Sequence, residues 1–124
     1  MNIKKIKIGI KSQQQALKEF ETAYTAVQKG MKVKEPEGIY FENIKALRTF
    51  ITPRRIELLS AIHRQKPESV YELAKLVKRE VKSVMTDLTL LKSLGLLHLK
   101  KEKKEREHTK PFVDYDSLQV EIAV

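Results

Sequence analysis

The chain lacks cysteine, has few aromatic residues and contains no long apolar run. None of its 124 residues is Cys, and aromatic residues make up 6%. Without Cys, a disulfide scaffold, a Cys-ligated zinc or iron–sulfur site and a thiol nucleophile are excluded. No stretch approaches the roughly 20 apolar residues of a membrane-spanning helix, and the basic N-terminal segment lacks the apolar centre of a signal peptide. We therefore expect a cytoplasmic protein that does not bind a membrane.

The sequence is equally poor in catalytic and metal-binding patterns. His63, His98 and His108 are far apart and lack the spacing of metal ligands. The four glycines are isolated, so no phosphate-binding loop is present, and no Ser stands in a G-x-S-x-G motif. We expect a protein that is not an enzyme and that holds neither a metal nor a cofactor.

Positive charge is the strongest compositional feature. The chain has 25 Lys and Arg against 16 Asp and Glu, which gives a net charge of +9. Residues 50–113 carry a balance of +7, whereas residues 114–124 carry −3. A basic surface favours a polyanionic partner, although charge alone does not distinguish DNA from RNA. We therefore look for a nucleic-acid contact in residues 50–113.

Residues 1–49 form an N-terminal appendage in this interpretation. Ile6, Ile8 and Ile10 alternate with lysines, as in a half-buried strand. Ser12 begins a helix with apolar residues at helical spacing, and Gly30 ends it. Met31–Gly38 has no period and is read as a loop, and Ile39–Phe41 predicts a short strand. The appendage is thus strand–helix–strand, and it is a candidate surface for dimerisation or partner binding.

Residues 50–116 predict three helices and then strands. Thr52-Pro53 begins a helix that ends near Arg64, Ser69 with Glu72 forms a capping box for Val70–Val77, and Val81–Leu94 is a longer helix that ends at Gly95. The faces expected to be buried include Ile56 in the first helix and Val81 in the third. The sequence after these helices predicts strands at Leu96–Leu99, Phe112–Tyr115 and Leu118–Val124, with Lys100–Lys110 as a charged hairpin tip.

This order is typical of a winged helix-turn-helix, so we expect an α+β fold with that domain at residues 50–116 and a C-terminal strand at 117–124. The third helix then presents short or cationic side chains to the bases of a major groove. The expected base-reading residues are Lys82, Ser83, Thr86 and Thr89. The expected phosphate contacts that fix the register are Ser69, Lys78 and Arg79. The expected DNA contacts of the wing are Lys101, Lys103, Lys104, Arg106 and Lys110.

The run Glu72–Leu97, ELAKLVKREVKSVMTDLTLLKSLGLL, resembles the helix-turn-helix core of MarR/ArsR-type regulators. With the segments GIYFE at Gly38–Glu42, TPRR at Thr52–Arg55 and PFVDYD at Pro111–Asp116, the whole chain resembles the HVO_A0114-like predicted transcriptional regulators of prokaryotes. The resemblance implies DNA binding, and often a role as the antitoxin or autoregulator of a toxin–antitoxin pair. Two positions depart from the pattern: Lys78 stands where many such proteins have Gly, and Glu80 stands where they have an Asp or Ser cap.

The sequence therefore predicts a sequence-specific, double-stranded DNA-binding regulator of transcription, a repressor or autoregulator that binds a near-palindromic site as a homodimer. The N- and C-terminal apolar strands and helix Gln13–Lys29 are the candidate dimer surface. The alternative is an antitoxin or other interaction module that neutralises a toxin protein, with DNA binding secondary. RNA binding is a third reading, against which stands the lack of a stacking platform of aromatic residues.

Overall fold

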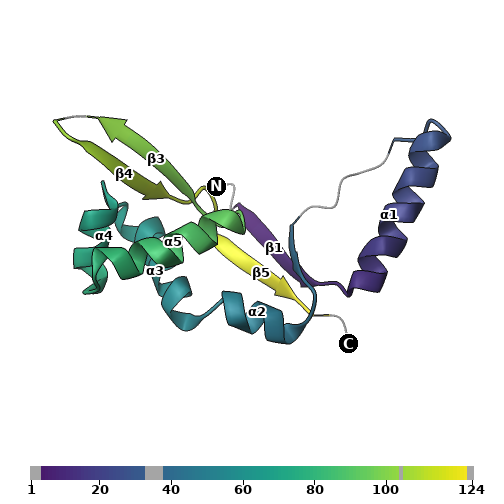
Figure 1. Cartoon of the computed structure of the whole chain (residues 1–124), viewed down its shortest axis with the longest axis horizontal. Coiled ribbons are helices and arrows are strands. Elements are labelled where there is room, and N and C mark those ends of the chain that lie inside the picture. The colour runs from purple at the N-terminus through teal and green to yellow at the C-terminus, as the bar shows by residue number, and fades with distance from the viewer. Residues whose placement is uncertain (1–3, 33–37, 104, 123–124) are drawn as a thin grey trace. The chain divides into compact units, whose positions relative to one another are not determined.

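The computed structural model describes residues 4–32, 38–103 and 105–122, and within them the chain is an α+β protein with five helices and five strands (Figure 1). The chain divides into two compact units. The helical unit contains Lys4 and residues 50–116, and the sheet unit contains the described parts of residues 5–49 and 117–122. Within the described residues, no helix combines the length and the apolar character that a membrane crossing requires.

The sheet unit is built on three parallel strands in the order β2-β1-β5. They are β1 (Lys5–Ile10), β2 (Ile39–Phe41) and β5 (Ser117–Glu121). The predicted strand–helix–strand order is present, with α1 (Gln13–Gln28) between β1 and β2, and α2 (Ile44–Phe50) follows. The alternation in β1 is confirmed, because Ile8 is fully buried while Lys5 and Lys7 are exposed.

Local signals set the ends of these elements. The Ser12 hydroxyl accepts a hydrogen bond from the Gln15 backbone N–H at 3.1 Å, and so caps α1. Gly38 precedes β2 with a φ of +116°, a conformation that L side chains rarely adopt. A Cβ atom there would lie 2.7 Å from the Lys7 carbonyl oxygen, so only glycine lets β2 begin this close to β1. The expected loop Met31–Gly38 falls largely on residues 33–37, which lie outside the described residues.

The helical unit contains α3 (Pro53–Gln65), α4 (Val70–Val77) and α5 (Val81–Ser93), followed by the antiparallel pair β3 (His98–Lys103) and β4 (Glu107–Phe112) (Figure 1). The predicted caps are confirmed: the Thr52 hydroxyl accepts from the Arg55 N–H at 3.3 Å, and the Ser69 hydroxyl accepts from the Glu72 N–H at 3.0 Å. Glu80 precedes α5 without a side-chain capping bond.

The core of the helical unit is aliphatic. The phenolic hydroxyl of buried Tyr115 donates to the Leu96 carbonyl oxygen at 2.6 Å, and so attaches the segment after β4 to this core. The side chains with less than 2% of their surface exposed come from α3, α4, α5, the segments beside these helices and β4: Leu58, Ile62, Leu73, Val84, Leu88, Leu91, Leu96, Leu97, Pro67 and Pro111.

Two residues that we expected on buried faces are not buried. Ile56 is 40% exposed and Val81 is 39% exposed. The buried face of α3 is centred on Leu58 and Ile62, and at 3.6 residues per turn Ile56 lies nearly opposite Leu58. Val81 is the first residue of α5, so no earlier turn of that helix covers it.

The strand boundaries after α5 also differ from expectation. The strand begins at His98 rather than Leu96, because the Leu96 N–H donates to the Leu91 carbonyl oxygen at 2.9 Å and the Leu96 carbonyl oxygen accepts from Tyr115. Most of Lys100–Lys110 belongs to β3 and β4 rather than to a hairpin tip. The second strand ends at Phe112, so the expected strand Phe112–Tyr115 is wrong, and the expected strand Leu118–Val124 is found as Ser117–Glu121.

Candidate nucleic-acid interface

One face of α5 is polar and open to solvent. Lys82, Thr86 and Thr89 are spaced by four and three residues, which places them along one stripe of a helix, and all three are exposed. Ser93 is also exposed and continues the stripe by four more residues. Val84, Leu88 and Leu91 are fully buried on the other face. The structure therefore brings together three of the four expected base-reading residues.

The two threonines of this stripe bond to their own helix. The Thr86 hydroxyl donates to the Lys82 carbonyl oxygen at 3.0 Å, and the Thr89 hydroxyl donates to the Met85 carbonyl oxygen at 2.9 Å. Since each hydroxyl proton is used within the helix, each oxygen can still accept a hydrogen bond. The stripe thus offers a lysine ammonium as donor and two hydroxyl oxygens as acceptors.

Ser83, the fourth expected reading residue, is exposed beside the stripe, but its hydroxyl bonds to Arg79. The Arg79 Nη2 atom donates to the Ser83 hydroxyl at 2.7 Å and to Asp87 Oδ2 at 2.8 Å. Asp87 Oδ1 accepts from Arg55 Nε at 3.1 Å. Arg55, Arg79 and Asp87 form what we call the Arg–Asp–Arg cluster, and their side chains are only 14% to 21% exposed.

The Arg–Asp–Arg cluster keeps Asp87 ionised. Burial by itself would raise the pKa of Asp87, but the hydrogen bonds and charges of Arg79 and Arg55 outweigh this effect and hold the pKa below its usual value. Asp87 is the single acid in the sequence of α5. Its charge is therefore compensated inside the helical unit.

Arg79 is consequently occupied within the protein. We expected it to contact phosphate, yet its Nη2 atom bonds Ser83 and Asp87, and its Nη1 atom is buried without a hydrogen-bond partner. This geometry gives Arg79 an anchoring role that joins the end of α4 to α5. Its phosphate contact stays a prediction.

Ser69 and Lys78, the other two residues expected to contact phosphate, lie at the two ends of α4. The Ser69 hydroxyl caps the helix, and Glu72 Oε2 accepts the Glu68 N–H at 2.9 Å. The start of α4 is therefore satisfied by its own side chains and carries a carboxylate, which disfavours a phosphate there. Lys78 follows α4 with φ 57° and ψ 49°, the left-handed conformation, and its side chain is exposed.

The cations of the hairpin are divided between its two faces. Lys101 pairs with Thr109 and Lys103 pairs with Glu107, so these two lysines lie on the same face of the β3–β4 pair, and both are exposed. Lys110 is on the opposite face, where its ammonium lies 3.9 Å from Glu68. Arg106 is exposed beside the turn, and the expected contact Lys104 lies outside the described residues.

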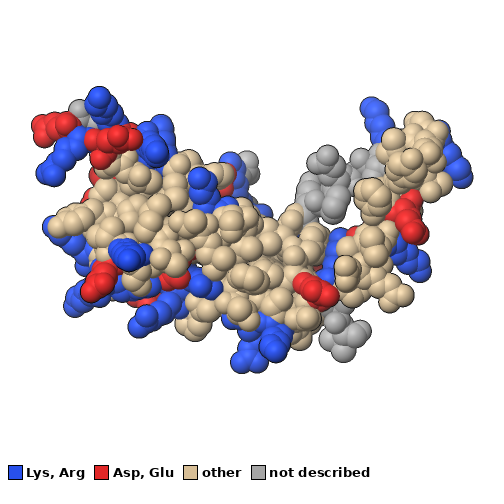
Figure 2. Space-filling view, in the orientation of Figure 1, with Lys and Arg blue, Asp and Glu red and all other residues tan. Residues whose placement is uncertain are grey.

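Figure 2 shows Lys and Arg atoms spread over the helical unit, with Asp and Glu atoms among them at the end of the hairpin. Residues 100–110 do include three acids, Glu102, Glu105 and Glu107. The hairpin is therefore a surface of mixed charge, whereas the α5 stripe carries no acid.

Sequence reasoning missed two features of this face. It did not pair Asp87 of the third helix with Arg55, which is 32 positions earlier in the chain. It also missed Ser93, although the spacing of eleven residues from Lys82 places the two on the same side of a helix.

Comparison with known proteins gives one result for this part of the chain. The family model HVO_A0114 matches residues 50–120, which is more than half of the sequence. The match includes α3, α4, α5, β3 and β4 and reaches into β5. No curated protein matches the chain.

Proposed function

This chain belongs to the HVO_A0114 family, and from the chemistry of its helical unit we propose that it is a sequence-specific, double-stranded DNA-binding regulator of transcription, acting as a repressor or autoregulator. In this proposal residues 50–116 are a winged helix-turn-helix, with α4 and α5 as the helix-turn-helix and β3 and β4 as the wing. The observation that carries the proposal is the acid-free stripe on α5, since the helix's single acid is held by two arginines.

The stripe has the chemistry of base reading. A lysine ammonium bonds the O6 and N7 acceptors of guanine, which makes Lys82 suited to a G·C pair. The oxygens of Thr86 and Thr89 are acceptors, so they suit the amino groups of adenine or cytosine, and their methyl groups suit the methyl group of thymine. Side chains this short let the helix approach the base edges closely.

Contacts to phosphate would come from the exposed cations around the stripe. Lys78 lies just before α5, and Lys101, Lys103 and Arg106 belong to the hairpin. Such contacts add affinity without sequence information. If about six phosphates are neutralised, the association constant should fall with roughly the fifth power of the salt concentration.

The test is a fluorescence-anisotropy titration with the duplex immediately upstream of the protein's own gene and with a scrambled duplex of the same length. The test variant is Lys82→Ala with Thr86→Ala. Its matched control is Lys45→Ala with Thr49→Ala on α2, because the Thr49 hydroxyl donates to the Lys45 carbonyl oxygen at 2.8 Å in the same arrangement. Both pairs are exposed, and both variants lose one positive charge.

The wild type and the control should prefer the native duplex, whereas the test variant should bind both duplexes equally. Losing one good base contact costs about 1–3 kcal/mol of discrimination, or roughly a 5- to 150-fold change in relative affinity. If the test variant still prefers the native duplex, α5 is not the helix that reads the bases. A wild type that binds both duplexes equally at every salt concentration would refute sequence-specific binding.

A further inference from the structure

Helix α1 leaves its large apolar side chains exposed to solvent. No residue of α1 is buried, and those that come closest, at intermediate burial, are Ala23 and Ala26. A surface helix normally buries its large apolar residues and exposes its small and polar ones. Here five large apolar residues of α1 and the turn after it are 58% to 69% exposed: Leu17, Phe20, Tyr24, Val27 and Met31.

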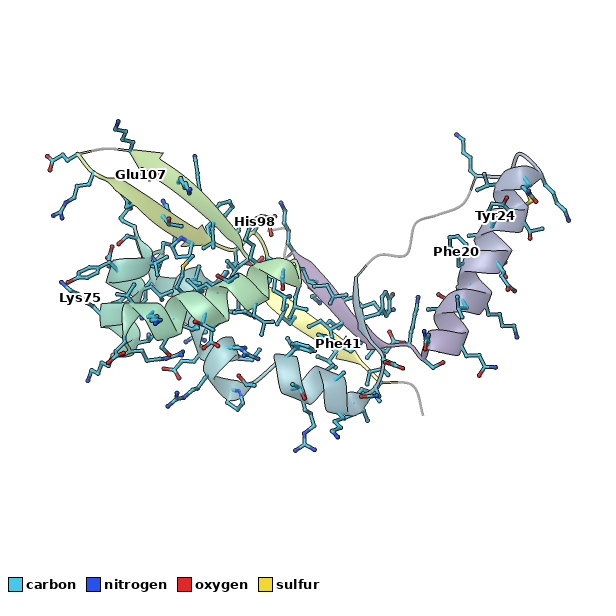
Figure 3. The ribbon with its side chains drawn as sticks, in the orientation of Figure 1. Phe20, Tyr24, Phe41, Lys75, His98 and Glu107 are labelled. Atoms are coloured by element: carbon cyan, nitrogen blue, oxygen red, sulfur yellow. The ribbon has the colours of Figure 1, made fainter. Side chains whose placement is uncertain are left out.

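Four of these residues lie on one side of α1. Leu17, Phe20, Tyr24 and Val27 are spaced by three, four and three positions, which is the a and d pattern of a helix that packs against a second helix, and Met31 follows the turn at Gly30 that ends α1. Phe20 and Tyr24 lie side by side on α1, with their ring centres 6.4 Å apart (Figure 3). We call the five residues the α1 seam. Single exposed apolar residues are ordinary on a protein surface, but a contiguous stripe of this kind marks an interaction site.

The charge around the α1 seam points to the kind of partner. The α1 segment has two acids, Glu19 and Glu21, and two bases, Lys18 and the capping Lys29, so it is neutral in a chain of net charge +9. Gln14, Glu21 and Gln28 flank the seam on one side and Ala16 and Ala23 on the other, so Glu21 is the one charged residue among these five. The flanks carry no base that would attract an acidic partner. A neutral helix with the same apolar stripe, such as α1 of a second copy, matches the seam along its length, with Glu21 as the one acid at its edge.

The area of the seam is sufficient for such a pair. At these exposures each of the five side chains offers roughly 100 Å², which gives about 500 Å² in one copy and about 1,000 Å² in two. A specific protein interface needs about 1,000–1,200 Å² in total. Small residues beside the seam, Ala16 and Ala23, allow the two helices to approach closely.

We propose that two copies of this chain pair through their α1 seams, with the helices antiparallel. In an antiparallel pair each a position packs against a d position of the other helix. Around a two-fold axis at the level of Thr22, Phe20 then packs on the partner's Tyr24, and Leu17 packs on the partner's Val27. This inference goes beyond DNA binding and does not depend on it, since it is argued from α1 alone.

Sedimentation equilibrium of the full chain tests the pairing. The wild type should show a monomer–dimer equilibrium, and Phe20→Glu, which places a charge in the middle of the seam, should weaken it by at least about tenfold. Thr22→Glu is the matched control, because it adds the same charge on the opposite side of the same helix and should leave the dimer intact. Far-UV circular dichroism should show equal helix content in the three proteins.

A second measurement tests the orientation. The chain has no cysteine, so single cysteines can be introduced without background. Under oxidation, a mixture of Phe20→Cys and Tyr24→Cys should give mainly the mixed disulfide, as the antiparallel pairing requires. If each variant instead forms mainly disulfides with copies of itself, the antiparallel orientation is refuted.

Three outcomes would overturn the proposal. If the wild type stays monomeric up to hundreds of micromolar, a second copy of the chain does not bind the α1 seam. A dimer equally weakened by Phe20→Glu and Thr22→Glu, or by neither, would place the interface elsewhere. A stable complex with the neighbouring gene's product that Phe20→Glu abolishes, with no self-association of the free chain, would assign the seam to that protein. The anisotropy titration is read separately, so failure of DNA binding is distinguishable from failure of pairing.

Discussion

Arg79 and Asp87 are joined by a 2.8 Å ion pair that ties the turn after α4 to α5. Arg79 lies in that turn, one residue past the Lys78 cap, and Asp87 lies in the second turn of α5. The same carboxylate accepts from Arg55 of α3, so one side chain links all three helices of the unit. The orientation of the α5 stripe therefore depends on a polar cluster as well as on the apolar core.

Asp87→Asn should destabilise the helical unit by about 1–3 kcal/mol, because the variant loses a charged acceptor shared by two poorly exposed guanidinium groups. Urea unfolding monitored by circular dichroism measures the change. Glu80→Gln removes an exposed acid that makes no capping bond and should change the stability by less than about 0.5 kcal/mol. Equal effects of the two substitutions would show that the cluster does not stabilise the fold.

The carboxylate of Asp87 should make the stability of the protein sensitive to acid. The folded pKa of Asp87 is lower than its unfolded value, which is about 3.9 for a free Asp. A lowered pKa contributes stability that is fully present above the unfolded value and is lost as the pH falls through the folded value. From about pH 5 downward, the free energy of unfolding should fall less steeply in Asp87→Asn than in the wild type. If the free energies of unfolding of the two proteins fall in parallel as the pH is lowered, the ionisation of Asp87 is not a source of stability.

Lys78 should be replaceable by glycine with a gain in stability. Its φ of 57° is in the left-handed region, which costs an L residue roughly 1–2 kcal/mol, whereas glycine adopts it freely. Part of the gain is offset by the greater freedom of glycine in the unfolded chain, so Lys78→Gly should stabilise the protein by about 0.5–1 kcal/mol. Lys75→Gly, inside α4, should instead destabilise it by about 1 kcal/mol. Thermal unfolding of the two variants compares them directly.

Tyr115→Phe should destabilise the helical unit by about 1–2 kcal/mol, because it removes the 2.6 Å bond to the Leu96 carbonyl oxygen. Burial raises the pKa of Tyr115, so the unfolded chain loses this proton first. The wild type should therefore lose stability as the pH rises above about 10, the pKa of a free Tyr, and the variant should lose less. Unfolding in guanidinium at pH 9 and pH 11 measures both effects.

The helix boundaries could be predicted because their signals are local. Ser12, Thr52 and Ser69 each cap a helix through a bond to an N–H three residues later, and such a bond depends only on neighbouring sequence. The spacing of Lys82, Thr86 and Thr89 likewise placed them on one face. The resemblance to the HVO_A0114 family, expected for the whole chain, is confirmed by the family match over residues 50–120.

The features that the sequence does not predict depend on contacts between residues that are far apart in the chain. Nothing near Asp87 in the sequence indicates that Arg55 will bond it, or that the Arg79 guanidinium will bond Asp87 and Ser83. Periodicity likewise identified the apolar side of α1, but it cannot say whether that side faces the sheet or solvent. The expected strand Phe112–Tyr115 is wrong because Tyr115, although its residue type suits a strand, is instead buried with its hydroxyl donating to the Leu96 carbonyl oxygen.

The parallel pairing of β1 with β5 sets an order for assembly. Lys5 is matched with Ser117, so the sheet joins two segments that lie on either side of residues 50–116 in the sequence. During synthesis on a ribosome, β1 emerges first and has no β5 to pair with until the last residues of the pair are added. Closing so long a loop is slow in an unfolded chain, but a helical unit that has already folded shortens it. The nascent protein should thus acquire its helical unit before its three-stranded sheet.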